Sequence, residues 1–245
     1  MKKVSAGILV AMAFFGMAST IRAQQAPAAP REKFSVNQAA ERIPNLDTVK
    51  RQLREYQACT CDCGCYARDL DRQADSAIAF LRQRAARRGE GEKLAMVLDI
   101  DETTLSNFEE MLKTDFAYNN DVFNAWVASA QAPAILGTLR LYQEARNLGV
   151  TVFFITGRSE KQRAATEKNL RAEHFDGWSR EQLIMRDPET EAGLTAQEYK
   201  TRHRAELAEK KYVLILNVGD QWSDLKGVPE AEFSVKYPDP YYFLP

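Results

Sequence analysis

The chain has 245 residues, enough to bury one sizeable core, which indicates one domain or two small ones. Its composition, 45% hydrophobic and 27% charged, is typical of a globular protein and excludes a disordered or fibrous one. A formal net charge of −1 gives no electrostatic basis for binding a nucleic acid polymer or an anionic membrane.

Residues 1–23 have the order of features found in a secretory signal peptide. Lys2 and Lys3 precede an apolar run over residues 6–17, and small residues follow as far as Ala23. The run is shorter than the roughly 20 apolar residues of a membrane span, although a retained N-terminal anchor is the alternative interpretation. We therefore expect a secreted or periplasmic protein that keeps no stable membrane anchor after cleavage. Residues 24–44 are predicted to be a linker at the mature N-terminus.

All four cysteines lie close together, as Cys59, Cys61, Cys63 and Cys65. In an exported protein an even number of cysteines first indicates disulfides. Pairing Cys59 with Cys63 and Cys61 with Cys65 is the connectivity that avoids joining residues two apart, which would strain the bridge. A zinc site and free thiols are the alternatives, although zinc sites usually space their cysteines as CxxC.

Two helices are predicted before the first strand. Helical periodicity begins near residue 45, where apolar residues recur at three- and four-residue intervals: Leu46, Val49, Leu53 and Tyr56. A second helix is predicted over residues 67–86, with one apolar face made of Leu70, Ala74, Ala77, Ile78 and Leu81. We expect these helices, within residues 45–90, to form an N-terminal layer on a domain that extends to residue 245.

Strands and helices alternate after residue 93. The predicted strands are 94–100, 150–156, 183–185 and 212–219, and the predicted helices are 134–148, 160–172 and 195–210. The strands are continuously apolar, which suits strands that are covered on both faces. This order predicts a doubly wound, Rossmann-like α/β domain with a parallel sheet and helices on both faces.

An insertion of about residues 107–131 interrupts the alternation after the first strand. It carries five large aromatic residues among polar ones: Phe108, Phe116, Tyr118, Phe123 and Trp126. We expect a small helical cap above the carboxyl ends of the strands. The aromatic residues form either the core of this cap or a platform for a substrate, with Phe108 and Trp126 as the first candidates.

Polar side chains follow three of the predicted strands: Asp99 and Asp101, then Thr156, Gly157 and Arg158, and finally Asp220 and Asp224. Ligands of open parallel sheets bind outside the carboxyl ends of the strands. Residues two apart on an extended strand point the same way, so Asp99 and Asp101 are expected to face one cleft, together with Asp220.

Three converging carboxylates are costly in an apolar crevice unless a cation neutralises them. Ligands that are all oxygen favour a hard ion such as Mg²⁺, which often binds alongside a phosphate. Surface acids at a strand end would explain any one of these residues, but they explain less well why acids follow two separate buried strands. The sequence therefore predicts a Mg²⁺ site.

The segments "DIDETTLSN", "FFITGR" and "NVGDQWSDL" resemble the motifs of the haloacid dehalogenase (HAD) superfamily. They are most similar to its secreted acid phosphatases of the class B and plant acid phosphatase-like group, subfamily IIIB. The segments "FNAWV", "APAILGTLRLY", "QRAATEKNL" and "YPDPYYFLP" extend the resemblance from about residue 45 to residue 245. It implies a HAD-type fold and a secreted, Mg²⁺-dependent acid phosphatase that hydrolyses phosphate monoesters.

The resemblance also implies roles for the first group of residues. Asp99 matches the nucleophile that forms an aspartyl-phosphate, and Asp101 matches the general acid and base. Thr156 and the backbone N–H of Gly157 match the group that holds the phosphoryl oxygens, and Arg158 is placed in the same phosphate site.

The metal ligands implied by the resemblance are Asp99, Asp220 and the main-chain carbonyl of Asp101, with Asp224 in support. Lys200, in "EYKTRHR", is the best match for the family's charge-balancing lysine, although Thr201 stands where relatives commonly have serine. Lys210 and Lys211 are the alternatives, but they end a helix, where a cation is favourable for other reasons.

The expected partner is a small phosphate ester, with nucleoside monophosphates as candidates, and a homo-oligomer is compatible with the sequence. The sequence leaves two alternative functions. One is phosphotransfer, in which an acceptor alcohol replaces water at the same site. The other is a non-catalytic storage or binding protein, against which the retention of the matched catalytic residues argues.

Overall fold

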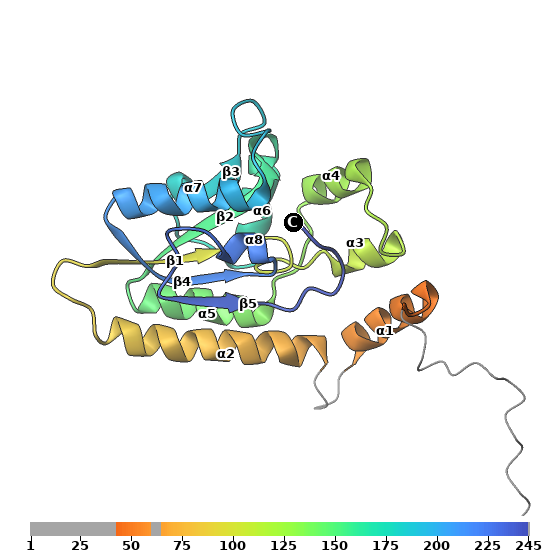
Figure 1. The fold of residues 1–245 in the computed structure, drawn as a ribbon, viewed down its shortest axis with the longest axis horizontal. Coiled ribbons are helices and arrows are strands. Elements are labelled where there is room, and N and C mark those ends of the chain that lie inside the picture. The colour runs from red at the N-terminus through yellow and green to blue at the C-terminus, as the bar shows by residue number, and fades with distance from the viewer. Residues whose placement is uncertain (1–42, 60–64, 245) are drawn as a thin grey trace, which may run out of the picture. The chain divides into compact units, whose positions relative to one another are not determined.

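A computed structural model describes residues 43–59 and 65–244, and these residues are built around a five-stranded sheet (Figure 1). The strand order is β3-β2-β1-β4-β5, and every neighbouring pair is parallel. The strands are β1 (Lys93–Leu98), β2 (Thr151–Ser159), β3 (Leu183–Arg186), β4 (Tyr212–Gly219) and β5 (Phe233–Lys236). The predicted parallel α/β sheet is confirmed, with β5 as a further strand that the sequence did not predict.

The described part of the chain contains eight α-helices and two short 3-10 helices. The α-helices are α1 (Leu46–Ala58), α2 (Tyr66–Ala85), α3 (Phe108–Lys113), α4 (Asn120–Ser129), α5 (Leu136–Asn147), α6 (Arg163–Ala172), α7 (Ala196–Glu209) and α8 (Trp222–Leu225). The 3-10 helices are η2 (Glu160–Gln162) and η3 (Arg180–Gln182). None of these helices combines the length and the apolar character that crossing a membrane requires.

Three of the predictions fall outside the described residues. They are the signal peptide, most of the linker, and the pairing of the cysteines, because both proposed bridges include a residue, Cys61 or Cys63, that the structure does not describe.

Both faces of the sheet are buried, as the continuously apolar strands predicted. In β1, Leu94, Met96 and Leu98 belong to the larger hydrophobic cluster, which includes residues of α2 and α5. The alternate residues Ala95 and Val97 belong to a second cluster, which includes residues of α7. Successive side chains of a strand point to opposite faces, so one apolar run supplies two cores.

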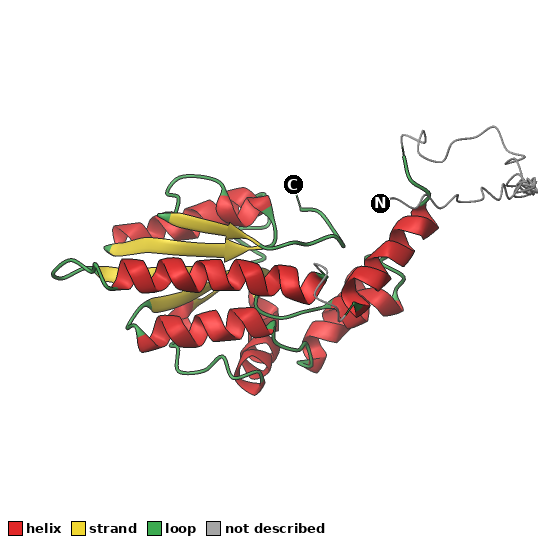
Figure 2. Cartoon of the chain, turned by 90° about the horizontal axis from the view of Figure 1, so that it is seen from below, coloured by secondary structure: helices red, strands yellow, loops and turns green. Residues whose placement is uncertain are grey.

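Helices α2 and α5 lie side by side on one face of the sheet (Figures 1 and 2). The predicted apolar face of α2 is buried there. Their backbones approach closely at Gly137, where an added Cβ would lie 2.9 Å from the Cβ of Ala74. By contrast α1 has no fully buried residue, and Leu46 of its predicted apolar face is 65% exposed.

The sheet topology places a crevice beside β1. The chain runs outward from β1 through β2 to β3 and then returns to β4 on the other side of β1. Such a reversal of strand order opens the crevice in which doubly wound proteins bind ligands, at the carboxyl ends of the strands. Asp99 follows β1 and Asp220 follows β4, so both lie at this point. Helices α3 and α4 lie beyond the same edge of the sheet (Figure 1).

Candidate active site

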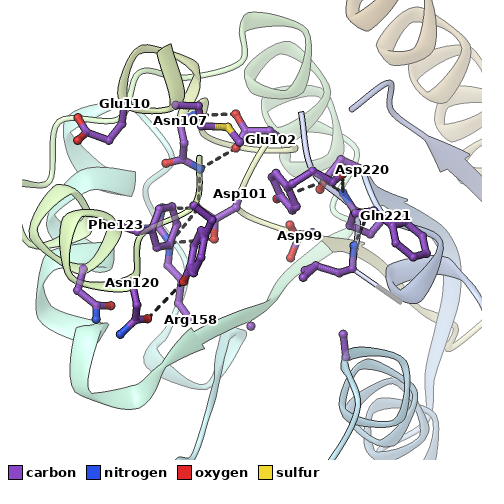
Figure 3. Close-up of a pocket in the computed structure, with 18 of the residues that line it drawn as sticks. Asp99, Asp101, Glu102, Asn107, Glu110, Asn120, Phe123, Arg158, Asp220 and Gln221 are labelled. Atoms are coloured by element: carbon purple, nitrogen blue, oxygen red, sulfur yellow. Dashed lines mark hydrogen bonds and ion pairs between the residues drawn. The ribbon is translucent and has the colours of Figure 1, made fainter. Parts of the chain in front are cut away.

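A cavity of about 660 Å³ opens at this edge of the sheet (Figure 3). Of the residues predicted from sequence, it brings together Asp99, Asp101, Gly157, Arg158, Lys200, Asp220 and Asp224. Thr156, Phe108 and Trp126 are described by the structure but do not line the cavity. The cavity therefore has a charged wall at the strand ends, and the insertion and the carboxy-terminal segment supply the opposite wall.

Asp99, Asp220 and Asp224 form a buried carboxylate cluster. One oxygen of each lies within 4.8 Å of the others, and each side chain is at most 9% exposed. Burial, together with the charges of Asp224 and Asp99, raises the pKa of Asp220 well above its usual value. A buried set of oxygen donors fits a hard divalent cation, which would remove this repulsion.

Asp99, Asp101 and Asp220 line one cavity, as expected, but the third carboxylate of the close cluster is that of Asp224 and not that of Asp101. Strand β1 ends at Leu98, and the backbone N–H groups of Thr104 and Leu105 both donate to the carbonyl of Ile100. The chain turns there, so the rule that residues two apart point the same way does not apply after Asp99. Asp224, predicted only as a supporting residue, provides the third carboxylate.

Lys200 reaches the cluster from α7, and its side chain is buried. Its Nζ contacts Oδ1 of Asp99, lies 3.0 Å from Oδ1 of Asp224, and donates to the carbonyl of Ile155 at 2.5 Å. Burial lowers the pKa of Lys200, but the charges of Asp224 and Asp99 outweigh it and hold this pKa above its usual value. Lys200 therefore remains a cation beside Asp99.

The same surroundings act on Asp99. Burial has the largest effect on the pKa of Asp99 and raises it, and the neighbouring charges of Asp224 and Asp101 raise it further. Against the opposing effect of Lys200, they raise the pKa of Asp99 to about 7. A carboxylate with this pKa is poorly solvated and lies in contact with a cation, which is a setting typical of a functional residue.

Asp101 lies in a separate network within the same cavity. Arg158 donates to its Oδ1 from Nη2 at 2.7 Å, and Asn107 donates to the same oxygen from Nδ2 at 2.8 Å. Burial alone would raise the pKa of Asp101, but Arg158 and Asn107 outweigh it and the net shift is downward. Arg158 was predicted to bind phosphate, whereas the structure pairs its buried guanidinium with Asp101.

Asn107 was not predicted from the sequence, and it connects Asp101 to the insertion. Its backbone N–H and its Nδ2 both donate to the carboxylate of Glu102, at 2.7 Å each. Its Oδ1 accepts from Nε1 of Trp126 in α4 at 2.8 Å. Glu102 and Asn107 both lie in the first motif, DIDETTLSN. This additional acid and amide were the signal in the sequence that could have identified the network around Asp101.

Thr156 and Gly157 lie on β2, which continues beyond its predicted end as far as Ser159. Oγ1 of Thr156 accepts from the backbone N–H of Arg158 at 3.1 Å, and the side chain is fully buried. A Cβ added to Gly157 would have no atom within 4 Å. Gly157 thus leaves open space where a ligand can approach the backbone.

Phe108 and Trp126, the first candidates for a substrate platform, do not line the cavity. Phe108 is 7% exposed and packs in the core against Phe116 and Tyr241, because it begins α3 on the side that faces the protein. Trp126 is partly buried and is bonded to Asn107. The aromatic residues that line the cavity are Phe116, Tyr118 and Phe123 of the insertion and Tyr242 and Phe243 of the carboxy-terminal segment.

The loop after β4 packs tightly against the end of this strand. A Cβ on Gly219 would lie 2.3 Å from the Cβ of Asp224, so the glycine allows Asp224 to fold back against β4. Arg204, which is fully buried, donates to the carbonyls of Asp224 and Pro229 at 2.5 and 3.1 Å. These contacts fix the backbone on which Asp220 and Asp224 stand.

Both the sequence and the fold of this protein are similar to those of known acid phosphatases. The family model described as "HAD superfamily, subfamily IIIB (Acid phosphatase)" matches residues 17–245. Acid phosphatase 1 of Solanum lycopersicum is 36% identical over 184 residues, which cover 73% of this chain and 69% of the tomato protein. The stem 28 kDa glycoprotein of Glycine max is 35% identical, over 62% of this chain and 61% of the soybean protein.

Among solved structures, the class C acid phosphatase from Bacillus anthracis has a similar fold, with a TM-score of 0.65. It is 23% identical, and the match covers 80% of this chain and 86% of the Bacillus chain. The family model matches more than nine tenths of the sequence, and the strand-end residues other than Thr156 line one cavity. This protein therefore belongs to the acid phosphatases of HAD superfamily subfamily IIIB.

Proposed function

We propose that this protein is an exported, Mg²⁺-dependent phosphatase that hydrolyses small phosphate monoesters through an aspartyl-phosphate on Asp99. The observation that carries the proposal is the contact between Asp99 and Lys200 at the carboxyl end of β1, with Asp101 in the same cavity. The cation of Lys200 offsets negative charge where an anionic phosphate would approach an anionic nucleophile.

In the first step, a carboxylate oxygen of Asp99 forms a bond to phosphorus as the bond to the leaving oxygen breaks. Asp101 gives a proton to the leaving alkoxide from its protonated form, and its lowered pKa favours the ionised form that the second step requires. In the second step, Asp101 takes a proton from water as the water oxygen attacks phosphorus, which releases phosphate and restores the carboxylate of Asp99. The contacts of Arg158 and Asn107 orient Asp101 for both transfers.

The phosphoryl group would rest against β2 and α7. We assign the backbone N–H of Gly157 and the ammonium of Lys200 to its oxygens, and the buried hydroxyl of Thr156 would hold the backbone of β2 at this position through Arg158. Asp99 and Asp220 would hold Mg²⁺ together with the main-chain carbonyl of Asp101, and the carboxylate of Asp224, which completes the cluster, would be a further ligand. The ion would supply positive charge against the transferring group.

The leaving group would lie against the aromatic side chains of the opposite wall. Tyr118 is 75% exposed, and its ring centroid is 5.8 Å from that of Phe123. An aromatic base can stack on such rings without being read by hydrogen bonds. We therefore propose a preference for aromatic leaving groups, such as those of nucleoside monophosphates, over glycerol phosphate.

Export is supported by the order of charged, apolar and small residues in the first 23 positions. The naming of a soybean relative as a stem glycoprotein is consistent with passage through a secretory pathway. A storage protein without catalysis is the alternative from a different class. The buried pair of Asp99 and Lys200 argues against it, because burying such a pair carries a desolvation cost that a storage role does not require.

The proposal is tested with purified protein on a panel of phosphate esters. We expect phosphate release that exhaustive chelation abolishes and added Mg²⁺ restores. Product analysis with glycerol present separates hydrolysis from phosphotransfer, because transfer yields glycerol phosphate in addition to inorganic phosphate. Turnover undiminished by chelation would contradict the metal assignment, and a folded protein that releases no phosphate with any ester would support the storage role.

A further inference from the structure

Gln221 connects the carboxylate cluster to the carboxy-terminal segment of residues 239–244. It directly follows Asp220, and both residues line the cavity (Figure 3). Only 4% of Gln221 is exposed. Its Nε2 donates to Oδ2 of Asp220 at 2.7 Å and to Oδ2 of Asp239 at 2.6 Å, and its Oε1 accepts from the backbone N–H of Leu244 at 3.1 Å. Both amide hydrogens and the amide oxygen are therefore engaged.

These contacts determine how Asp220 is oriented. Its Oδ1 accepts from the hydroxyl of Thr103 at 2.9 Å, and its Oδ2 accepts from Gln221 and, at 3.4 Å, from the hydroxyl of Tyr242. A carboxylate that is bonded at both oxygens cannot rotate freely. Thr103, Gln221 and Tyr242 come from three separate parts of the chain, so the plane of Asp220 depends on tertiary structure.

The carboxy-terminal segment is itself anchored by contacts that lie outside the carboxylate cluster. Asp239 accepts from the backbone N–H of Tyr241 at 2.9 Å through Oδ1, which leaves its Oδ2 directed at Gln221. The hydroxyl of Tyr241 donates to Gln57 of α1 at 2.8 Å, and its ring packs against Phe116. The segment is therefore a fixed support for the amide of Gln221.

We propose that residues 239–244 act through Gln221 as a positioning element for the metal ligand Asp220. The inference rests on the proposed function, since it takes Asp220 as a ligand of Mg²⁺. Hydrogen bonds to a metal ligand hold it in the geometry that the ion requires, and losing one typically weakens metal affinity 10- to 100-fold. Gln221 and Asp239 do not touch the substrate or the reacting atoms in this account.

The test is Mg²⁺ binding to the metal-free full chain, measured by isothermal titration calorimetry without substrate. Gln221→Ala and Asp239→Ala are each expected to raise the dissociation constant for Mg²⁺ about 10- to 100-fold. The double variant should bind within about threefold of Gln221→Ala, because residues in one hydrogen-bond network are not additive. Asp239→Asn keeps an acceptor oxygen for Gln221 and should restore most of the affinity.

Phe243→Ala is the matched control. Phe243 lies in the same segment and is 72% exposed, and its side chain makes no bond to Gln221. Its removal should leave the Mg²⁺ dissociation constant unchanged. Circular dichroism and thermal unfolding verify that each variant is folded. If Gln221→Ala does not fold, the comparison of Asp239→Ala with Asp239→Asn tests the proposal instead.

The outcomes separate this inference from the proposed function. A wild-type protein that binds no Mg²⁺ overturns the metal assignment, and the inference falls with it. A wild-type protein that binds Mg²⁺, with Gln221→Ala and Asp239→Ala binding equally well, overturns the inference alone. Losses that simply add in the double variant would show that Asp239 does not act through Gln221.

Discussion

Asp99, Asp220 and Asp224 on one side of the cavity are buried, whereas Tyr118 and Phe243 on the other side are 75% and 72% exposed. The first side, with Lys200 and Asp101 added, is here called the phosphoryl wall. The second, made of Phe116, Tyr118, Phe123, Tyr242 and Phe243, is called the apolar wall. The two walls differ in what fixes the positions of their side chains.

In the phosphoryl wall each charge has a specific partner, such as Lys200 for Asp99 and Arg158 for Asp101. Removing one partner leaves an uncompensated buried charge, which costs about 3–5 kcal/mol. In the apolar wall the ring contacts are non-directional, apart from the hydroxyl hydrogen bonds of Tyr118 and Tyr242, and a substitution mainly changes the area available to a ligand. Chemistry should therefore depend on the phosphoryl wall, and the choice of leaving group should depend on the apolar wall.

The largest effect is expected from Asp99→Asn, which removes the nucleophile. An amide cannot form the acyl phosphate, so kcat should fall roughly 10⁴- to 10⁶-fold, the scale seen when a covalent nucleophile is lost. Steady-state kinetics with every ester of the panel measures the loss, and thermal unfolding verifies that the variant is folded. A loss confined to some esters would place the nucleophile elsewhere.

The next effect is expected from Asp101→Asn, which removes the general acid. The loss in kcat should be about 10²- to 10⁴-fold for an alkyl phosphate, whose leaving group needs a proton. It should be much smaller for p-nitrophenyl phosphate, whose leaving group departs as an anion. Parallel assays of the two esters test the assignment, and equal losses on both would show that Asp101 does not protonate the leaving oxygen.

Selectivity should change when the apolar wall is altered. Tyr118→Ala and Phe123→Ala should each cost about 1–3 kcal/mol of stacking, or roughly 5- to 150-fold in kcat/KM, for a nucleoside monophosphate. Activity on glycerol phosphate should change little. Equal losses on the two substrates in a folded variant would mean that these rings only shape the insertion.

Phe108→Ala is the control for that prediction, because Phe108 belongs to the same insertion but is buried in the core. Truncating a buried phenylalanine typically costs about 3–5 kcal/mol of unfolding free energy. Chemical denaturation should show this loss, while the ratio of kcat/KM between the two esters stays near that of the wild type. A changed ratio would show that Phe108 contributes to substrate binding.

The smallest effect is expected where the insertion meets the phosphoryl wall. Trp126→Phe keeps a ring but removes the donor to Asn107, which costs about 0.5–1.5 kcal/mol. Since Asn107 orients Asp101, kcat should fall roughly 2- to 10-fold while KM stays constant. A change in KM alone would indicate that Trp126 acts on substrate binding.

Most of the fold could be predicted because burial leaves a pattern in the sequence. The apolar runs of β1 and β4 and the apolar face of α2 are long enough to be recognised, and acids directly after a buried strand stand out. Strand β5 has only the four residues Phe233–Lys236, and its alternating exposure gives no continuous apolar run. Short strands of this kind are set by pairing with a neighbour rather than by their own residues.

The site was only partly predictable because turns and distant segments complete it. The sharp turn at Ile100, followed by Glu102 at φ +54°, directs Asp101 to Arg158 instead of the carboxylate cluster. The contribution of Tyr242 and Phe243 depends on where residues 239–244 lie, and aromatic residues near a chain end carry no such information. Sequence motifs thus identified the strand-end residues but not the contacts that orient them.

The most direct test of the account is to trap the covalent intermediate. The wild-type protein, mixed rapidly with a phosphate-labelled aryl phosphate and Mg²⁺ and then quenched in acid, should carry up to one labelled phosphoryl group per chain. Mass spectrometry should place this group on Asp99, hydroxylamine should remove it, and Asp99→Asn should carry none. A label on another residue, or its absence at every quench time during normal turnover, would contradict the assignment of Asp99 as the nucleophile.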